Sequence, residues 1–289
     1  MHYDVDESST STITEAASTP PTEPLVQVTE TQLTSEYAVA HADVPASLPS
    51  GGDFHAAFLM QNGTEDVAVV MGDVAGHGPE QTAQAEHMRE LLSDCLSVGM
   101  SPAETLTAVN ALIEPDPNFE VFSTVFAGVL ESETGKLTYA SGGHEPALIA
   151  PAEGATGVVQ ELAAEGPPVG AFPGPLVKFE DNEVTVPVGG TLLLYTDGLP
   201  DAKHPHKRTE WLGLDRLKQL FAKLLKLSPQ QLVSTLIEHV SSFCRGHFFD
   251  DVTVMAIRRR APRLLRRRAK RPPVTNDEAQ QAPAASWDS

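Results

Sequence analysis

The sequence predicts an α+β sandwich in which helices pack outside antiparallel sheets. Several short segments are apolar or alternate between apolar and polar residues, and each is bounded by Gly, Asn, Asp or Pro, as strands commonly are. Strands outnumber helices, and many neighbouring strands are joined by loops too short for a crossover helix, which favours antiparallel pairing. Thr134-Gly135 has the composition of a hairpin turn. The expected strands are 67–71, 121–130, 136–140, 146–150, 158–162, 183–188, 191–195 and 252–258.

Four segments show helical spacing of apolar residues. One begins at Pro79, directly after a glycine, and runs towards Gly99. Two others open with Ser101 and Ser228, each followed by a proline and then by Glu or Gln at the third helical position, which is the pattern of a capping box. The fourth covers 214–225. We expect all four apolar stripes to face the core.

Length and composition predict one folded domain with disordered ends. The chain has 289 residues, of which 41% are hydrophobic, enough for a substantial core. Residues 1–25 are acidic and rich in Ser, Thr and Pro, so we expect a disordered leader; 26–258 form the domain, and 259–289 a basic, then Pro/Ala-rich, disordered tail. Cys95 and Cys244 are expected to be free thiols. The sequence has no secretory signal and no apolar run of about 18 to 20 residues, so we predict a cytoplasmic protein.

Charge is unevenly distributed along the chain. Nine of the 20 Lys and Arg residues lie between Arg258 and Arg271, so residues 1–257 carry 11 basic side chains against 36 acidic ones. Such an acidic body repels nucleic acid and needs cations wherever it binds phosphate. The basic run offers charge for a membrane surface or an acidic partner, although a solvated extension is the favoured interpretation.

Aspartates beside glycines, at the ends of expected strands, are the strongest functional signal. They are Asp53, Asp73, Asp197 and the pair Asp250 and Asp251. Taken singly, each has an ordinary role in a turn or a helix cap. Together they place carboxylates beside buried strands with few Lys or Arg nearby, and buried carboxylates need compensation. A metal ion is the simplest partner. Oxygen ligands, without a His/Cys pair at zinc spacing, favour Mg²⁺ or Mn²⁺.

Six motifs in order resemble a known family. The set resembles the bacterial SpoIIE-type phosphatases of the metal-dependent protein phosphatase (PPM, type 2C) superfamily over residues 26–257. The resemblance implies a four-layer α-β-β-α sandwich, with two central antiparallel sheets flanked by helices and two Mn²⁺ or Mg²⁺ ions at one end. The motifs are Gly51-Gly52-Asp53-Phe54, Gly72-Asp73-Val74-Ala75-Gly76-His77-Gly78, Ser141-Gly142-Gly143-His144-Glu145-Pro146, Gly166-Pro167-Pro168-Val169-Gly170, Tyr195-Thr196-Asp197-Gly198-Leu199 and Asp250-Asp251-Val252-Thr253.

The resemblance also implies roles for individual residues. Asp73 would bridge both ions, Asp53 and the carbonyl of Val74 would help to hold one, and Asp197 and Asp250 would hold the other. The leaving serine or threonine oxygen needs a proton, which water or a nearby histidine can supply. His77 is the candidate, although a histidine in a Gly-rich turn is as often structural, and we rank His144 lower.

The implied function is hydrolysis of phosphoserine or phosphothreonine in a regulatory protein, typically an anti-sigma factor antagonist of a partner-switching pathway. One departure weakens this expectation: family members commonly carry an aromatic and an acidic residue where this chain has His55 and Ala56. A phosphatase-fold binding module with weak or no catalysis is therefore the alternative. Another two-metal hydrolase, acting on nucleotides or nucleic acid, is a third hypothesis. The sequence decides no oligomeric state and leaves a homodimer open.

Overall fold

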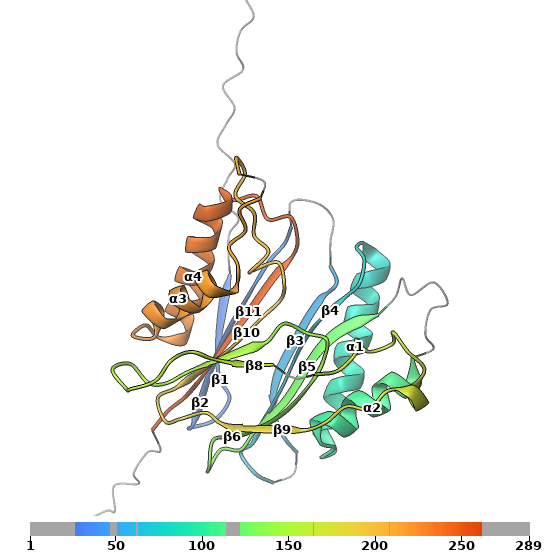
Figure 1. The fold of residues 1–289 in the computed structure, drawn as a ribbon. Helices are drawn as coiled ribbons and strands as arrows, with labels where there is room; N and C mark the ends of the chain where they lie inside the picture. The colour runs from blue at the N-terminus through green and yellow to red at the C-terminus, as the bar shows by residue number, and fades with distance from the viewer. Residues whose placement is uncertain are drawn as a thin grey trace, which may run out of the picture.

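Two antiparallel sheets pack face to face, and helices cover both outer faces (Figure 1). The computed structural model describes residues 27–46, 51–61, 63–113, 122–163, 165–207 and 209–261. The predicted four-layer sandwich is confirmed. In chain order the elements are β1 (Val28–Gln32), β2 (Tyr37–Val44), β3 (Asp53–Leu59), β4 (Val67–Val74), α1 (Pro79–Ser97), α2 (Pro102–Leu112), β5 (Ser123–Leu130), β6 (Lys136–Gly142), β7 (Ala147–Ala150), β8 (Gln160–Leu162), the 3-10 turn η1 (Gly174–Leu176), β9 (Asn182–Thr185), β10 (Thr191–Tyr195), α3 (Leu214–Leu224), α4 (Pro229–Cys244) and β11 (Val252–Arg259).

Each sheet has its own pair of helices. The six-stranded sheet has the order β1-β2-β11-β10-β7-β8, and the five-stranded sheet has the order β3-β4-β5-β6-β9. Helix α4 contacts β1, β2 and β11 of the first, whereas α1 and α2 contact β3 to β6 of the second. Figure 1 shows the two helix pairs on opposite sides of the molecule. All of the strand pairs are antiparallel, as the short connections predict.

Apolar side chains fill the three interfaces between the four layers. Because side chains alternate along a strand, each sheet sends one set between the sheets and the other set towards its helices. Val39 of β2 and Met71 of β4 belong to the central layer, whereas Ala40 and Val70 belong to the two outer layers. The largest fully buried side chains of the central layer are Tyr37, Phe126, Met71, Leu130, Leu137 and Leu162.

The helix starts match the sequence signals. Ser101 and Ser228 each accept a hydrogen bond from the backbone of the third helical residue, and Glu104 or Gln231 bonds back, so both capping boxes are present. Helix α1 begins at Pro79 and ends at Ser97.

Three strands were not predicted, namely β1, β2 and β3. The sequence of β1, VTETQ, is mostly polar because the strand lies at a sheet edge and is largely exposed. The sequence of β2, YAVAHADV, has few β-branched residues, yet it lies inside the sheet between β1 and β11. Burial on both faces selects small side chains there, overriding the weak strand propensity of alanine.

The first two arginines of the basic run are structural, because β11 extends one residue beyond its expected end at Arg258 and includes Arg259, where the tail was expected to begin. Arg258 donates to Thr191 Oγ1 and to the carbonyls of Leu225 and Leu227. Arg259, only 8% exposed, is the last residue of β11. The predicted leader and residues 262–289 of the predicted tail lie outside the described residues.

Cys95 and Cys244 are free thiols, as expected, although Cys95 is only partly buried. None of the helices in the described part of the chain has both the length and the apolar character that crossing a membrane requires.

Candidate metal centre

Asp53 and Asp73 face each other across adjacent strands of the five-stranded sheet. They are direct partners in the antiparallel register of β3 and β4. Asp73 follows Met71 on the face that points between the sheets, and Asp53 lies on the same face as Ala57, which packs against that central layer. Side chains of directly opposed residues lie about 4.5 to 5.5 Å apart at Cβ. The pairing of β3 with β4 therefore brings two carboxyl groups together.

Asp197 and Asp250 approach from the six-stranded sheet. Asp197 follows β10, and Asp250 lies just before β11, which is the hydrogen-bonded neighbour of β10. Thr196 links the two sheets at this point: its hydroxyl donates to Asp53 Oδ2 at 2.8 Å, and its backbone N–H donates to the carbonyl of Thr253 at 3.0 Å. Four strand ends thus converge. We call Asp53, Asp73, Asp197 and Asp250 the carboxylate cluster.

Two glycines allow this convergence. A Cβ on Gly52 would lie 2.4 Å from Asp73 Oδ1 and 2.4 Å from the carbonyl oxygen of Val74, so only the absence of a side chain leaves both oxygens open to one space. A Cβ on Gly198 would likewise meet the carbonyl of Asp251. The glycines flanking the aspartates in the sequence are required by close backbone approach.

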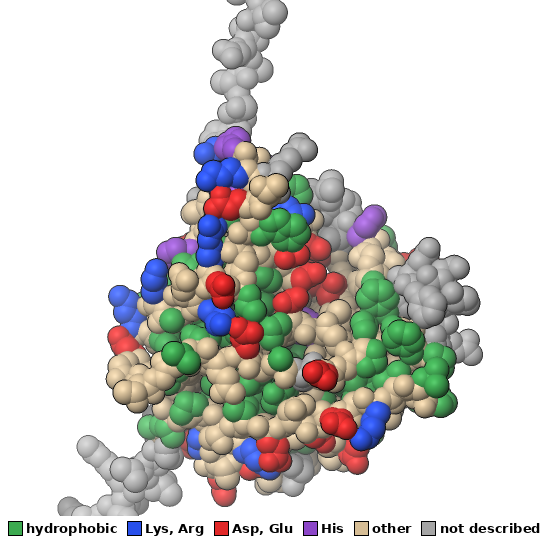
Figure 2. All heavy atoms as spheres, viewed as in Figure 1, with side chains coloured by type: hydrophobic (Ala, Val, Ile, Leu, Met, Phe, Trp, Pro, Cys, Tyr) green, Lys and Arg blue, Asp and Glu red, His purple; other side chains and the backbone are tan. Residues whose placement is uncertain are grey.

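Burial and mutual repulsion raise the pKa values of carboxyl groups in the cluster, and a bound cation would offset this repulsion. Burial, followed by the charges of Asp197, Asp250 and Asp251, raises the pKa of Asp73 to about 7. Burial and the neighbouring Asp73 raise the pKa of Asp53 well above its usual range. Figure 2 shows acidic side chains gathered on this face, just above the centre of the view.

Other carboxylates extend the negative region. Burial and the charge of Asp250 raise the pKa of Asp197, and Glu145 and Asp201 also have raised pKa values, in each case through burial and a nearby aspartate. The sequence analysis did not single out Glu145 or Asp201. Their signal was present, because Glu145 lies within the third motif and Asp201 lies two residues after the fifth, but a search for aspartates at strand ends passes over both.

The histidines near the cluster differ in position. His77 is exposed in the loop between β4 and α1. His144 lies behind the cluster, with Nδ1 3.0 Å from the hydroxyl of Thr124, which pairs with Asp73 in the sheet. Burial lowers the pKa of His144 to about 4, so its ring is neutral at pH 7 and holds no spare proton.

The alanine that departs from the family pattern lies on the other face of its strand. Ala56 packs against the layer between the five-stranded sheet and helices α1 and α2. Its side chain therefore points away from Asp53, which lies on the face between the sheets.

Two threonines of the motifs received no role from the sequence: Thr196 bonds to Asp53 of the other sheet, and the N–H of Thr253 donates to Thr196. The sequence did not indicate that His41, Asp43 and His55 lie together nearby. No spacing signal links His41 to His55, because they come from strands of different sheets.

A sandwich of two antiparallel sheets with helices outside is the fold of the type 2C phosphatase class. The Bacillus subtilis structure described as the PP2C phosphatase domain and a fragment of the regulatory domain of SpoIIE has this fold. Its TM-score is 0.63 at 19% identity, covering 82% of this chain and 69% of that one. The model of the family described as Stage II sporulation protein E (SpoIIE) matches residues 63–260, and the chain belongs to this family.

Two curated relatives show how much of a longer protein this domain represents. Protein IcfG of Synechocystis sp. is 28% identical over 243 residues, covering 72% of this chain and 36% of IcfG. Phosphoserine phosphatase RsbU of Bacillus subtilis is 25% identical over 219 residues, covering 75% of this chain and 62% of RsbU. The chain thus spans less than two thirds of either relative.

Proposed function

We propose that this chain is a metal-dependent phosphatase that hydrolyses phosphoserine or phosphothreonine in another protein. The observation that carries the proposal is the carboxylate cluster, in which Asp73 has a pKa of about 7 because several carboxyl groups share one partly buried space. Carboxyl groups that raise one another's pKa values in one partly buried space are candidates for cation binding or for catalysis.

The donor set fits two divalent ions of the Mg²⁺ or Mn²⁺ kind. Asp73 is proposed to bridge them, with Asp53 and the Val74 carbonyl on one side and Asp197 and Asp250 on the other. All of these ligands are oxygen atoms, which hard cations prefer. The space beside Gly52, which a Cβ would fill, gives access to both the Asp73 carboxylate and the Val74 carbonyl. When bound, the ions lower the pKa of water and neutralise the charge of the phosphoryl oxygens.

The protein's own groups then orient the reactants. Thr196 donates to Asp53 Oδ2 and so fixes the orientation of this carboxylate beside the cluster. His77, exposed at the start of α1, is proposed to protonate the leaving serine or threonine oxygen. His144, with its pKa lowered to about 4, is the weaker candidate for that role.

The substrate class follows from the family. RsbU carries the description phosphoserine phosphatase, and the resemblance to this family favours a phosphorylated anti-sigma factor antagonist as the substrate. The acidic surface around the cluster argues against nucleic acid, because the backbone phosphates of a polynucleotide would be repelled.

The test is a manganese-titrated assay on an aryl phosphate and on a phosphoserine protein. Asp73→Asn and Asp197→Asn are expected to abolish turnover of both substrates. Asp94→Asn, which changes an exposed aspartate on α1, is the matched control and should leave turnover unchanged. Near-normal turnover in either site variant would overturn the assignment.

The role of His77 has a separate test. An aryl phosphate with an acidic phenol as leaving group needs little protonation, whereas a serine alkoxide needs it fully. His77→Gln should therefore lower turnover of the phosphoserine protein by about 10²- to 10⁴-fold and leave the aryl phosphate much less affected. An equal loss on both substrates would point to a structural role.

Two other functions remain as outcomes of these assays. A non-catalytic binding module would show no manganese-dependent hydrolysis in the wild-type chain; its one support, Ala56, lies on the face away from Asp53. A nucleotide or nucleic-acid hydrolase would turn over a cyclic nucleotide or an oligonucleotide faster than a phosphoprotein.

A further inference from the structure

The facing surfaces of the two sheets both change from apolar to polar side chains near the carboxylate cluster. One surface is that of β2 and the other is that of β3. Along β2, Val39 belongs to the central core, and His41 and Asp43 follow on the same face. Along β3, Ala57 packs against that core, and His55 precedes it on the same face. We call His41, Asp43 and His55 the histidine cluster.

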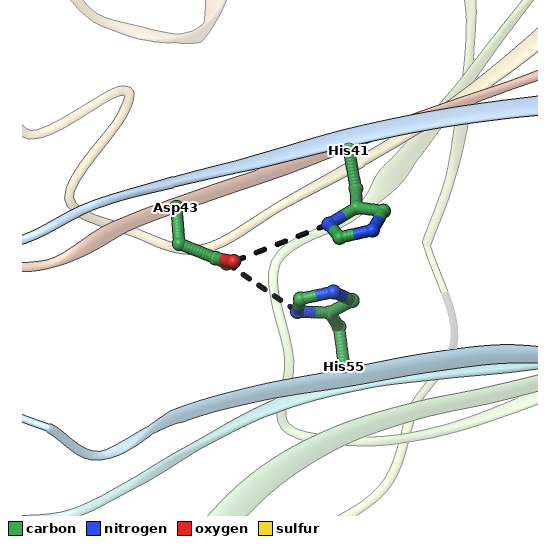
Figure 3. A group of neighbouring side chains, drawn as sticks. All are labelled: His41, Asp43 and His55. Atoms are coloured by element: carbon green, nitrogen blue, oxygen red, sulfur yellow. Dashed lines mark ion pairs between the residues drawn. The ribbon is translucent and has the colours of Figure 1, made fainter. Parts of the chain in front are cut away.

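The three side chains of the histidine cluster point at one another across the gap between the sheets. Asp43 Oδ1 lies 3.4 Å from His55 Nδ1, and Asp43 Oδ2 lies 4.0 Å from His41 Nδ1. The two ring centroids are 4.4 Å apart. Figure 3 shows His41 and Asp43 on one strand and His55 on the facing strand, with the carboxylate directed between the two rings.

The spacing of these atoms suits a tetrahedral metal ion. One potential ligand atom from each residue lies within 4.8 Å of the other two. A tetrahedral ion with bonds of about 2.0 to 2.1 Å holds its ligand atoms about 3.3 Å apart. The distance of 3.4 Å from His55 Nδ1 to Asp43 Oδ1 matches that value. The distance of 4.0 Å from His41 Nδ1 to Asp43 Oδ2 exceeds it, so His41 and the Asp43 carboxylate would both adjust around a bound ion.

An ion pair alone accounts for only part of this arrangement. The Asp43 carboxylate can satisfy His55 directly, but His41 Nδ1 is buried and makes no hydrogen bond in the part of the chain that the structure describes. An unsatisfied buried nitrogen costs about 1 to 3 kcal/mol. A shared cation would satisfy both imidazoles and the carboxylate at once.

We propose that the histidine cluster is a transition-metal site, selective for ions of the Zn²⁺ kind, which is separate from the carboxylate cluster and fastens β2 to β3. Imidazole nitrogen favours Zn²⁺ and Cu²⁺ over Mg²⁺, whereas the carboxylate cluster offers only oxygen. The side chains of His41, Asp43 and His55 are 26%, 56% and 19% exposed, which leaves an entry path and room for water as a fourth ligand.

This site reaches the carboxylate cluster through a chain of hydrogen bonds. Thr253 Oγ1 donates to Asp43 Oδ1 at 3.0 Å, and the N–H of Thr253 donates to Thr196 Oγ1 at 2.9 Å. Thr196 in turn donates to Asp53. A metal that fixes Asp43 would therefore also limit the movement of Asp53, which makes the histidine cluster a positioning site for the neighbouring one.

Electron paramagnetic resonance of bound Cu²⁺ distinguishes the two sites. A directly bound nitrogen splits the copper signal further, whereas an oxygen ligand does not, so only copper in the histidine cluster should show this splitting. The full chain is first saturated with Mg²⁺, which prefers the oxygen-only cluster, and one equivalent of Cu²⁺ is added. We expect coupling to two nitrogens, and we expect a large excess of Zn²⁺ to replace this nitrogen-coupled signal with the signal of copper released into solution.

Substitutions assign the nitrogens. His41→Gln and His55→Gln should each leave one coupled nitrogen and weaken Zn²⁺ binding at least about tenfold, and Asp43→Asn should keep both nitrogens while weakening binding. His206→Ala is the control, because His206 is an exposed histidine that lies beside the partly buried His204, outside the histidine cluster.

Coupling to two nitrogens that persists in either glutamine variant, or that disappears in His206→Ala, would overturn the proposal. So would a wild-type spectrum with fewer than two nitrogens. Far-UV circular dichroism of each metal-free variant shows whether it is folded. If a histidine variant is unfolded, Asp43→Asn still tests the proposal through weaker Zn²⁺ binding. Neither result depends on whether the chain hydrolyses phosphate.

Discussion

The two sheets are joined at both ends of the sandwich, by a buried arginine at one end and through a carboxylate at the other. At the end that carries the turn at Gly135, Arg259 of β11 donates to the carbonyls of Val186 and Glu133, which belong to connections of the five-stranded sheet. At the other end, Thr196 donates to Asp53 in the midst of crowded carboxylates. The first end satisfies its charge within the chain. The second end holds crowded carboxylates whose charge, in the function proposed above, bound cations would balance, so stability and the proposed function lie at different ends of the strands.

Asp73→Asn should have the largest effect, because it is expected to abolish turnover and at the same time to stabilise the metal-free protein. Burial and neighbouring carboxylates raise the pKa of Asp73 from 3.8 to about 7, so between these values the folded state holds more protons than the unfolded state. Stability of the metal-free protein therefore falls as pH rises through that interval, and the ionised group is a net cost at pH 8. Removing it should abolish turnover yet raise the metal-free free energy of unfolding by about 1 to 3 kcal/mol. Calorimetry in a chelator at pH 8 measures this; a lower melting temperature would contradict it.

Arg259→Met, at the end of the sandwich away from the carboxylate cluster, should lower stability and leave turnover nearly unchanged. It removes two hydrogen bonds from a buried charged donor to backbone carbonyls, so we expect the free energy of unfolding to fall by about 2 to 4 kcal/mol. Turnover per folded molecule should stay near normal. The neighbouring substitution Arg260→Met is the control. Denaturant titration measures the loss of stability, and activity assays at low temperature, where the variant stays folded, measure any loss of turnover.

Thr196→Val tests the link between the sheets at the site end. The valine keeps the shape of the side chain and removes both the bond to Asp53 and the bond accepted from the Thr253 N–H, so the apparent affinity for Mn²⁺ should fall about 10- to 100-fold. Maximal turnover at saturating Mn²⁺ should change less. Thr107→Val, on α2, removes a threonine hydroxyl that bonds only within its own helix and should leave the manganese curve unmoved.

The smallest expected effect is the pH dependence of metal binding. Because Asp73 has a pKa of about 7 without metal, an ion must displace a proton below that pH, and affinity should fall up to about tenfold per unit. Isothermal titration between pH 5.5 and 8 in buffers of different ionisation enthalpy measures both the slope and the proton release. Asp73→Asn should flatten the slope; an equally steep curve in that variant would assign the proton to another group.

Much of the fold and the members of the proposed site could be predicted from local signals. The capping boxes at Ser101 and Ser228 place two helices to within a residue, and the apolar run 191–195 is a strand with the same bounds. The glycines around Asp53 and Asp197 were visible as motifs, and the structure gives their reason in the contacts that a Cβ would make. These features depend on neighbours in sequence.

What could not be predicted depends on pairing between distant strands. Strand β2 carries small residues because it is buried in the middle of a sheet, and nothing local marks that position. His41 and His55 meet only because their two sheets stack, and the structural role of Arg259 depends on carbonyls more than 70 residues away. Sequence periodicity records which face a residue occupies, but not which residue it meets.

The position of β11 between β2 and β10 has a consequence for synthesis of the chain. Until Val252–Arg259 has left the ribosome, β2 and β10 have no common neighbour, and Asp250 is absent from the cluster. The nascent polypeptide therefore carries an incomplete six-stranded sheet with exposed edges for most of its translation, and such edges are prone to wrong pairing. Catalytic competence would then appear abruptly, with the last strand, rather than growing as the chain lengthens.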